Sequence, residues 1–145
     1  FYNRGLTYMN LQEYTKAKQD FEASLKLEES AKTWHMLGLS LAIAGRHEES
    51  INPFNNAIAL DNSNAQYYFH RAVSKGIINK HAEAINDYNK SITLNPKNPE
   101  AYFNRAISYI NVQNTQAGCN DFSKAIALGY EKAREMKNIY CGNSN

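Results

Sequence analysis

Arginine and aspartate recur along the chain at a fixed separation of sixteen residues. The pairs are Arg4 and Asp20, Arg71 and Asp87, and Arg105 and Asp121. A guanidinium and a carboxylate at one repeated distance can form a bidentate ion pair. The corresponding positions between the first two pairs hold Leu37 and Pro53, so both partners are missing there together. This joint absence predicts structural ion pairs, and the alternative is a row of ligand-binding arginines.

Histidines could provide metal ligands or proton transfer. His35 and His70 could face one another and hold a metal ion, but no further ligand follows at a recognisable spacing. His47 and His81 occupy equivalent positions of an internal repeat, which predicts equivalent packing roles. We therefore expect no metal and no other cofactor.

The two cysteines, Cys119 and Cys141, leave the cellular compartment open. Sequence alone cannot fix the distance between them. We predict two reduced thiols that pack as small apolar side chains, which slightly favours the cytoplasm. A disulfide bridge would instead favour a periplasmic or other extracytoplasmic location.

Catalytic motifs are missing from the sequence. It contains no G-x-S-x-G, H-E-x-x-H, phosphate-binding glycine loop or C-x-x-C. The net charge of +2 is too balanced to indicate a nucleic-acid partner. No apolar run approaches the roughly 18 residues of a membrane-spanning helix. We expect a folded segment, because 43% of its residues are hydrophobic. We do not expect an enzyme, because the catalytic motifs are missing.

The internal repeat sets the positions of these side chains. Small residues recur at Gly5, Gly38, Ala72 and Ala106, and aromatic residues recur in the same register at Phe21, Phe54, Tyr88 and Phe122. Within each unit the apolar residues are three or four positions apart, which predicts helices. A short polar break divides each unit into two helices. The small residue allows them to approach closely, and the aromatic ring fills the remaining space.

These units resemble the tetratricopeptide repeat, a helical hairpin of about 34 residues with the pattern W-x2-L-G-x2-Y…A-x3-F…P. The second unit shows it as Trp34-x2-Leu37-Gly38-x2-Leu41. The resemblance implies an all-α, right-handed superhelical solenoid. We expect one domain over residues 1–145, with repeats at about 1–30, 31–64, 65–98 and 99–132 and a capping helix over 133–141. The first unit starts inside its first helix, so we expect an excerpt of a longer protein.

The resemblance also implies a binding surface, because the first helices of stacked hairpins line a concave groove. In this family the groove binds peptides or extended segments of partner proteins. The corresponding positions here are Tyr2, Leu6, His35, Leu39, Phe69, His70, Val73, Phe103, Asn104 and Ile107. Most are apolar or aromatic, which is typical of an interaction site. We therefore expect a noncatalytic adaptor or scaffold that binds an apolar or aromatic peptide.

Two alternatives stand beside this interpretation. The inner residues could pack between adjacent first helices and expose little surface. The segment could also be a structural spacer that stacks on neighbouring repeats or on copies of itself. One subfamily of tetratricopeptide-repeat proteins binds the C-terminal carboxylate of chaperone tails with lysine and arginine side chains. We do not expect that function, because the corresponding positions supply only Arg134.

Overall fold

The computed structural model describes residues 1–142, and within that range it contains nine helices and no strand. They are α1 (Tyr2–Asn10), α2 (Tyr14–Leu27), α3 (Ala31–Ile43), α4 (His47–Leu60), α5 (Ala65–Ile77), α6 (His81–Leu94), α7 (Pro99–Asn111), α8 (Thr115–Ala127) and α9 (Lys132–Cys141). The helices α1, α3, α5 and α7 each pack most extensively on the helix that follows. The prediction of an all-α solenoid of helical repeats is confirmed.

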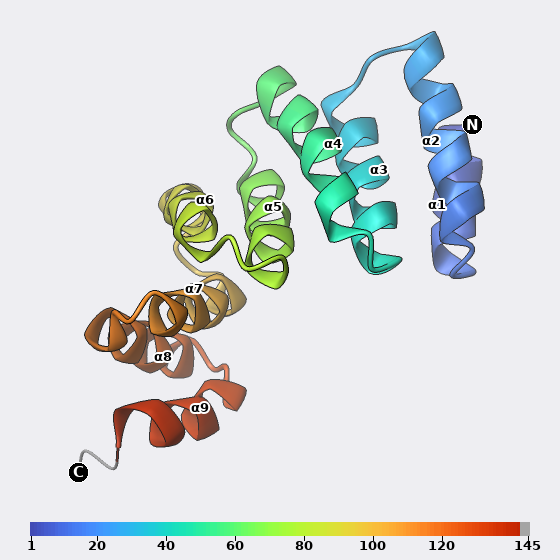
Figure 1. Cartoon of the computed structure of the whole chain (residues 1–145). Coiled ribbons are helices and arrows are strands. Elements are labelled where there is room, and N and C mark those ends of the chain that lie inside the picture. Colours follow the sequence, from blue (N-terminus) through green and yellow to red (C-terminus); the bar gives the residue numbers. More distant parts are fainter. Residues whose placement is uncertain (143–145) are drawn as a thin grey trace.

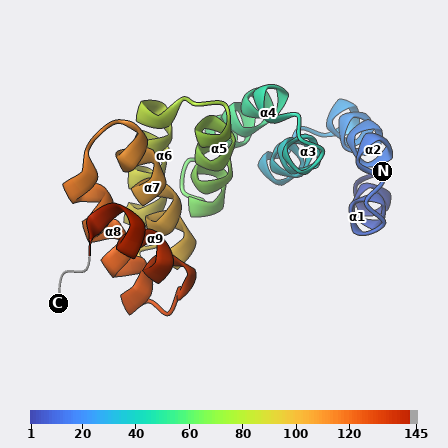
Figure 2. The same cartoon turned by 60° about the horizontal axis from the view of Figure 1, so that its bottom comes forward.

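The hairpins stack in chain order and form an arc, with the two termini at its opposite ends (Figure 1). Figure 2 shows α1 and α3 on the inner side of this arc, and α2 and α4 on the outer side. The inner surface is thus built from the first helix of each hairpin. Neighbouring side chains on this surface come from successive first helices, so they lie about one repeat apart in sequence.

The tight turn inside each hairpin uses a residue with positive φ. These residues are Gln12, Gly45, Asn79 and Gln113, with φ of 59°, 79°, 64° and 63°. Only glycine and, to a lesser degree, asparagine adopt this conformation readily. The turn is therefore relaxed at Gly45 and strained at the two glutamines.

Close contact between the two helices of a hairpin depends on the small and aromatic residues. A Cβ atom added to Gly38 would lie 2.5 Å from the ring of Phe54, and one added to Gly5 would lie 2.7 Å from Phe21. Both rings are completely buried. The packing of small residues against aromatic rings that the repeat predicts is confirmed for these two hairpins.

The repeated arginines form ion pairs inside their own hairpins. Nε and Nη2 of each arginine donate to the two carboxylate oxygens of the aspartate sixteen residues later. These distances are 2.7 and 2.7 Å for Arg4 and Asp20, 2.8 and 2.6 Å for Arg71 and Asp87, and 2.6 and 2.8 Å for Arg105 and Asp121. The hydrogen bonds from Arg4 lower the pKa of Asp20 below its ordinary value. The prediction of structural ion pairs is confirmed.

The prediction of two free thiols is wrong. Cys119 in α8 and Cys141 at the end of α9 form a disulfide bridge. Helix α9 packs along α8 and brings the two Cα atoms to 5.8 Å, which lies within the usual range for a bridge. The sequence could not show this, because the distance depends on how α9 folds back after the turn at Gly129.

Candidate functional site

Two small hollows lie along the first helices on the inner side of the arc. The α3–α5 hollow has a volume of about 330 Å³ and is lined by Leu39, Ala42, Ile43, His47, His70, Val73 and Ser74. The α5–α7 hollow has a volume of about 230 Å³ and is lined by Val73, Gly76, Ile77, His81, Tyr88, Asn104, Ile107 and Ser108. Together they form the inner groove discussed below.

The two hollows are equivalent, because their lining positions are related by one repeat. Leu39 corresponds to Val73, and His70 corresponds to Asn104. Val73 lines both hollows, so the two lie side by side and form a band along α3, α5 and α7. Five of the groove residues predicted from the sequence line this band, namely Leu39, His70, Val73, Asn104 and Ile107.

Two exposed isoleucines extend the band and were missed by the sequence interpretation. The exposed fraction is 56% for Ile43 and 54% for Ile77. Each lies four residues after Leu39 or Val73, and side chains at this spacing share one face of a helix. This i, i+4 spacing was the signal that could have found them. They give the inner groove its most accessible apolar surface.

The phenylalanines predicted for the groove are buried, unlike the two isoleucines. Phe69 and Phe103 are only 7% and 6% exposed. Phe69 packs edge-on against Tyr88 of α6, and Phe103 lies 5.8 Å from Phe122 of α8 between ring centroids. These two rings are therefore buried, and the packing alternative describes them.

Tyr2 and Leu6 of α1 are partly buried and lie outside both hollows. They pack into the apolar cluster that α1, α2 and α3 share. Lys32 of α3 lies over the Tyr2 ring, with its Nζ 5.4 Å from the centroid. The structure thus separates these two predicted groove residues from the band around Val73.

His35 and His70 meet between α3 and α5. Nε2 of His35 and Nδ1 of His70 are 2.8 Å apart, so one imidazole donates a hydrogen bond and the other accepts it. Burial lowers the pKa of His35 to about 3 and that of His70 to about 4. Both rings are therefore neutral near pH 7. Within residues 1–142 no group of three or more potential ligands could hold a metal ion.

The other two histidines contact serines that also line the hollows. Nδ1 of His47 is 3.4 Å from Oγ of Ser74, and Nδ1 of His81 is 3.4 Å from Oγ of Ser108. A histidine beside a serine can activate a nucleophile, which must then reach its substrate. Ser74 and Ser108 are 0% and 2% exposed, so these contacts act as packing.

Comparison with known protein families extends this description. Three models match the chain: "Tetratricopeptide repeat" over residues 1–30 and again over residues 31–64, and "TPR repeat" over residues 78–112. The chain is a tetratricopeptide-repeat protein. The family resemblance drawn from the sequence is confirmed.

Solved structures of tetratricopeptide-repeat proteins share this fold. The chain is similar to the MamA protein, with a TM-score of 0.83 at 24% identity, over 92% of this chain and 73% of that one. It is similar to YrrB, described as a TPR protein with an unusual peptide-binding site, with a TM-score of 0.88 at 21% identity, over 94% and 72%. It is also similar to the first TPR of Spaghetti (RPAP3) bound to the HSP90 peptide SRMEEVD, with a TM-score of 0.75 at 20% identity, over 78% and 91%.

No curated protein sequence matches this tetratricopeptide-repeat chain. None of the helices within residues 1–142 combines the length and the apolar character needed to cross a bilayer.

Proposed function

We propose that this protein is a noncatalytic interaction module, an adaptor or scaffold, whose inner groove binds an extended apolar segment of a partner protein. The observation that carries the proposal is the recurrence of one apolar hollow in successive repeats. A repeated hollow suits a ligand that is itself a chain, because successive side chains can enter successive hollows.

The chemistry of the groove supports this kind of ligand. Leu39, Val73 and Ile107 provide an apolar floor, and Ile43 and Ile77 provide exposed apolar edges. Asn104 adds an amide, which can both donate to and accept from a peptide main chain.

The spacing of the hollows predicts the sequence of the partner. Adjacent packed helices lie about 8–10 Å apart, and a chain in the polyproline II conformation advances about 3.1 Å per residue with three residues per turn, so side chains three residues apart point to the same side. We therefore expect two apolar side chains three residues apart in the bound segment. YrrB and the RPAP3 repeat are described with peptide sites, and this supports a peptide ligand for the present groove.

A library of short random peptides displayed on phage tests the proposal. Selected peptides should share two apolar residues at a spacing of three, and replacing either one with aspartate should abolish binding. Selection of charged peptides without this pattern would contradict the proposal. We expect neither hydrolytic activity nor nucleic-acid binding from the same protein.

A structural spacer or self-assembling segment is the second candidate. Ile139 and Tyr140 on the last helix are 64% and 45% exposed, which leaves apolar surface at that end of the solenoid. Neighbouring repeats or a second copy could cover it. Analytical ultracentrifugation separates the two candidates, because a spacer that stacks should associate as its concentration rises, whereas a monomeric adaptor should not.

The disulfide bridge between Cys119 and Cys141 favours an oxidising compartment as the location of this protein, because such bridges are rare in a reducing cytosol. A periplasmic or other extracytoplasmic location therefore replaces the cytoplasmic preference drawn from two free thiols.

A further inference from the structure

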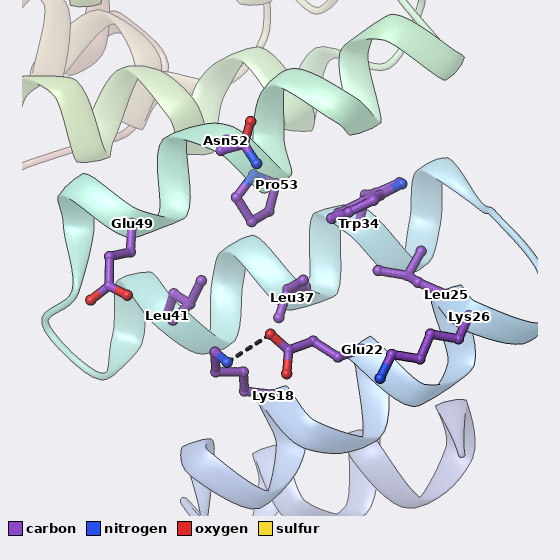
Figure 3. Close-up of a pocket in the computed structure, with 10 residues that line it drawn as sticks. All are labelled: Lys18, Glu22, Leu25, Lys26, Trp34, Leu37, Leu41, Glu49, Asn52 and Pro53. Carbon is purple, nitrogen blue, oxygen red and sulfur yellow. Dashed lines mark hydrogen bonds and ion pairs between the residues drawn. The ribbon is translucent and has the colours of Figure 1, made fainter.

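A third and larger hollow lies on the outer side of the arc, between α2 and α4. Its volume is about 710 Å³. Figure 3 shows Trp34 and Leu37 of α3 on its floor, Pro53 projecting from α4, and Glu22 projecting from α2. This outer hollow lies at the repeat that lacks the arginine–aspartate pair.

The following repeats show what occupies the corresponding place. The guanidinium carbon of Arg71 lies 5.8 Å from the centre of the Tyr68 ring, and that of Arg105 lies 5.6 Å from Tyr102. Nη1 of each arginine also donates a hydrogen bond of 2.8 Å to an asparagine of the preceding second helix, Asn55 or Asn89. The space between successive second helices is thus an arginine site.

The outer hollow keeps an aromatic ring and a polar side chain at the places they have around this site, but Pro53 stands where the other repeats have the aspartate partner. Leu37 replaces the arginine, Trp34 stands at the position of Tyr68 and Tyr102, and Glu22 stands at the position of Asn55 and Asn89. The aromatic ring is also fixed in a similar way. The Trp34 indole donates to Glu29 at 3.3 Å, whereas the Tyr68 hydroxyl donates to the carbonyl of Asn62, the residue equivalent to Glu29.

We propose that the outer hollow binds an arginine side chain of a partner protein. The guanidinium stacks on Trp34 and pairs with Glu22, and its aliphatic part lies over Leu37 and Pro53. Tryptophan is the best aromatic partner for a cation, and a carboxylate attracts a guanidinium more strongly than an amide does. The site is distinct from the inner groove, because it lies on the opposite side of the arc.

Two carboxylates, Glu22 and Glu49, and two lysines, Lys18 and Lys26, line the outer hollow, so an incoming guanidinium must displace a lysine from a carboxylate. Glu22 is held by Lys18 at 2.6 Å, a partly exposed pair four residues apart on one helix. Such pairs are weak, so a bidentate arginine can displace Lys18. Glu49 is paired with Arg46 at 2.5 Å and stays neutralised. Lysine has no planar fork and should bind less well than arginine.

Fluorescence gives a direct test, because Trp34 is the single tryptophan of the chain. The probe is a capped tripeptide Gly-Arg-Gly, compared with Gly-Lys-Gly and with a tripeptide that carries norleucine. We expect a saturable change in Trp34 emission with the arginine peptide, and affinities at least about tenfold weaker for the other two. Equal affinity for the norleucine peptide would assign the hollow to apolar side chains and overturn the proposal.

Two variants on α2 sharpen the test. Glu22→Gln should weaken binding of the arginine peptide at least about tenfold, since the charged partner is lost. Lys18→Gln is the matched control: it frees Glu22 and should bind the peptide as tightly as the original protein or more tightly. Unchanged affinity in Glu22→Gln, weaker affinity in Lys18→Gln, or no saturable signal in the original protein would each contradict the site.

Discussion

His35 and His70 are 35 residues apart in sequence, yet their Nε2 and Nδ1 atoms lie 2.8 Å apart between α3 and α5. The pair joins the second and third hairpins next to the inner groove. Burial keeps both imidazoles neutral, because it lowers their pKa values to about 3 and about 4 from an ordinary value of 6.5.

These lowered pKa values predict how stability depends on pH. Between about pH 4 and 6.5 the unfolded chain binds more protons at these histidines than the folded chain does. The free energy of unfolding should therefore be fully maintained above pH 6.5 and fall as the pH drops through this window, by up to about 1.4 kcal/mol per pH unit for each histidine. Urea unfolding from pH 7 to pH 4 measures the slope.

The equivalent positions of other repeats provide the control for this prediction. His35→Phe introduces the residue found at Phe69, and His70→Asn introduces the residue found at Asn104. The double variant should lose most of the slope between pH 6.5 and 4. If it keeps the full slope, the histidine pair is not the source of the pH dependence.

The bridge between Cys119 and Cys141 should stabilise the last hairpin and α9. The cysteines are 22 residues apart, and closing a loop of this size contributes about 3 kcal/mol in the chain-entropy model. Adding dithiothreitol should lower the midpoint of urea unfolding. The variant Cys119→Ser with Cys141→Ser should show this lower midpoint without dithiothreitol, and adding dithiothreitol should not change it. Two titratable thiols in the native, unreduced protein would contradict the bridge.

The strained turn at Gln113 offers a stabilising substitution. Its φ of 63° is unfavourable for glutamine, and the corresponding turn of the second hairpin uses Gly45 with φ of 79°. Gln113→Gly should raise the free energy of unfolding by about 0.5–1 kcal/mol, because relief of strain exceeds the entropy cost of glycine. Gly45→Gln is the reciprocal control and should lower it. Equal melting temperatures in all three proteins would contradict this account.

The repeat positions explain how much of the fold could be predicted from the sequence. Gly38 and Phe54 are in contact because the hairpin brings together residues sixteen positions apart, so their types and spacing are sufficient to predict the packing. The same reasoning predicted the pair of Arg105 and Asp121. Local helical spacing and a short turn determine both contacts.

The inner groove was predicted less well, because the exposure of a side chain depends on how the two helices of a hairpin are rotated against each other. Phe69 and Ile77 both belong to α5, but only Ile77 is exposed. The rotation of α5 against α6 turns Phe69 toward Tyr88, and sequence spacing does not specify that rotation. The bridge at Cys119 was missed for a similar reason, since it depends on the path of the chain before α9.

Binding at the inner groove is the central claim, and one titration tests it most directly. A selected peptide is titrated by calorimetry into the original protein, into Ile43→Asp with Ile77→Asp, and into a control with Leu27→Asp and Leu60→Asp. The control residues are 76% and 50% exposed and end α2 and α4, so both double variants replace two exposed apolar side chains. We predict at least about a tenfold loss of affinity in the isoleucine variant and no loss in the control, with unchanged circular dichroism. Equal affinity for all three folded proteins would contradict the account.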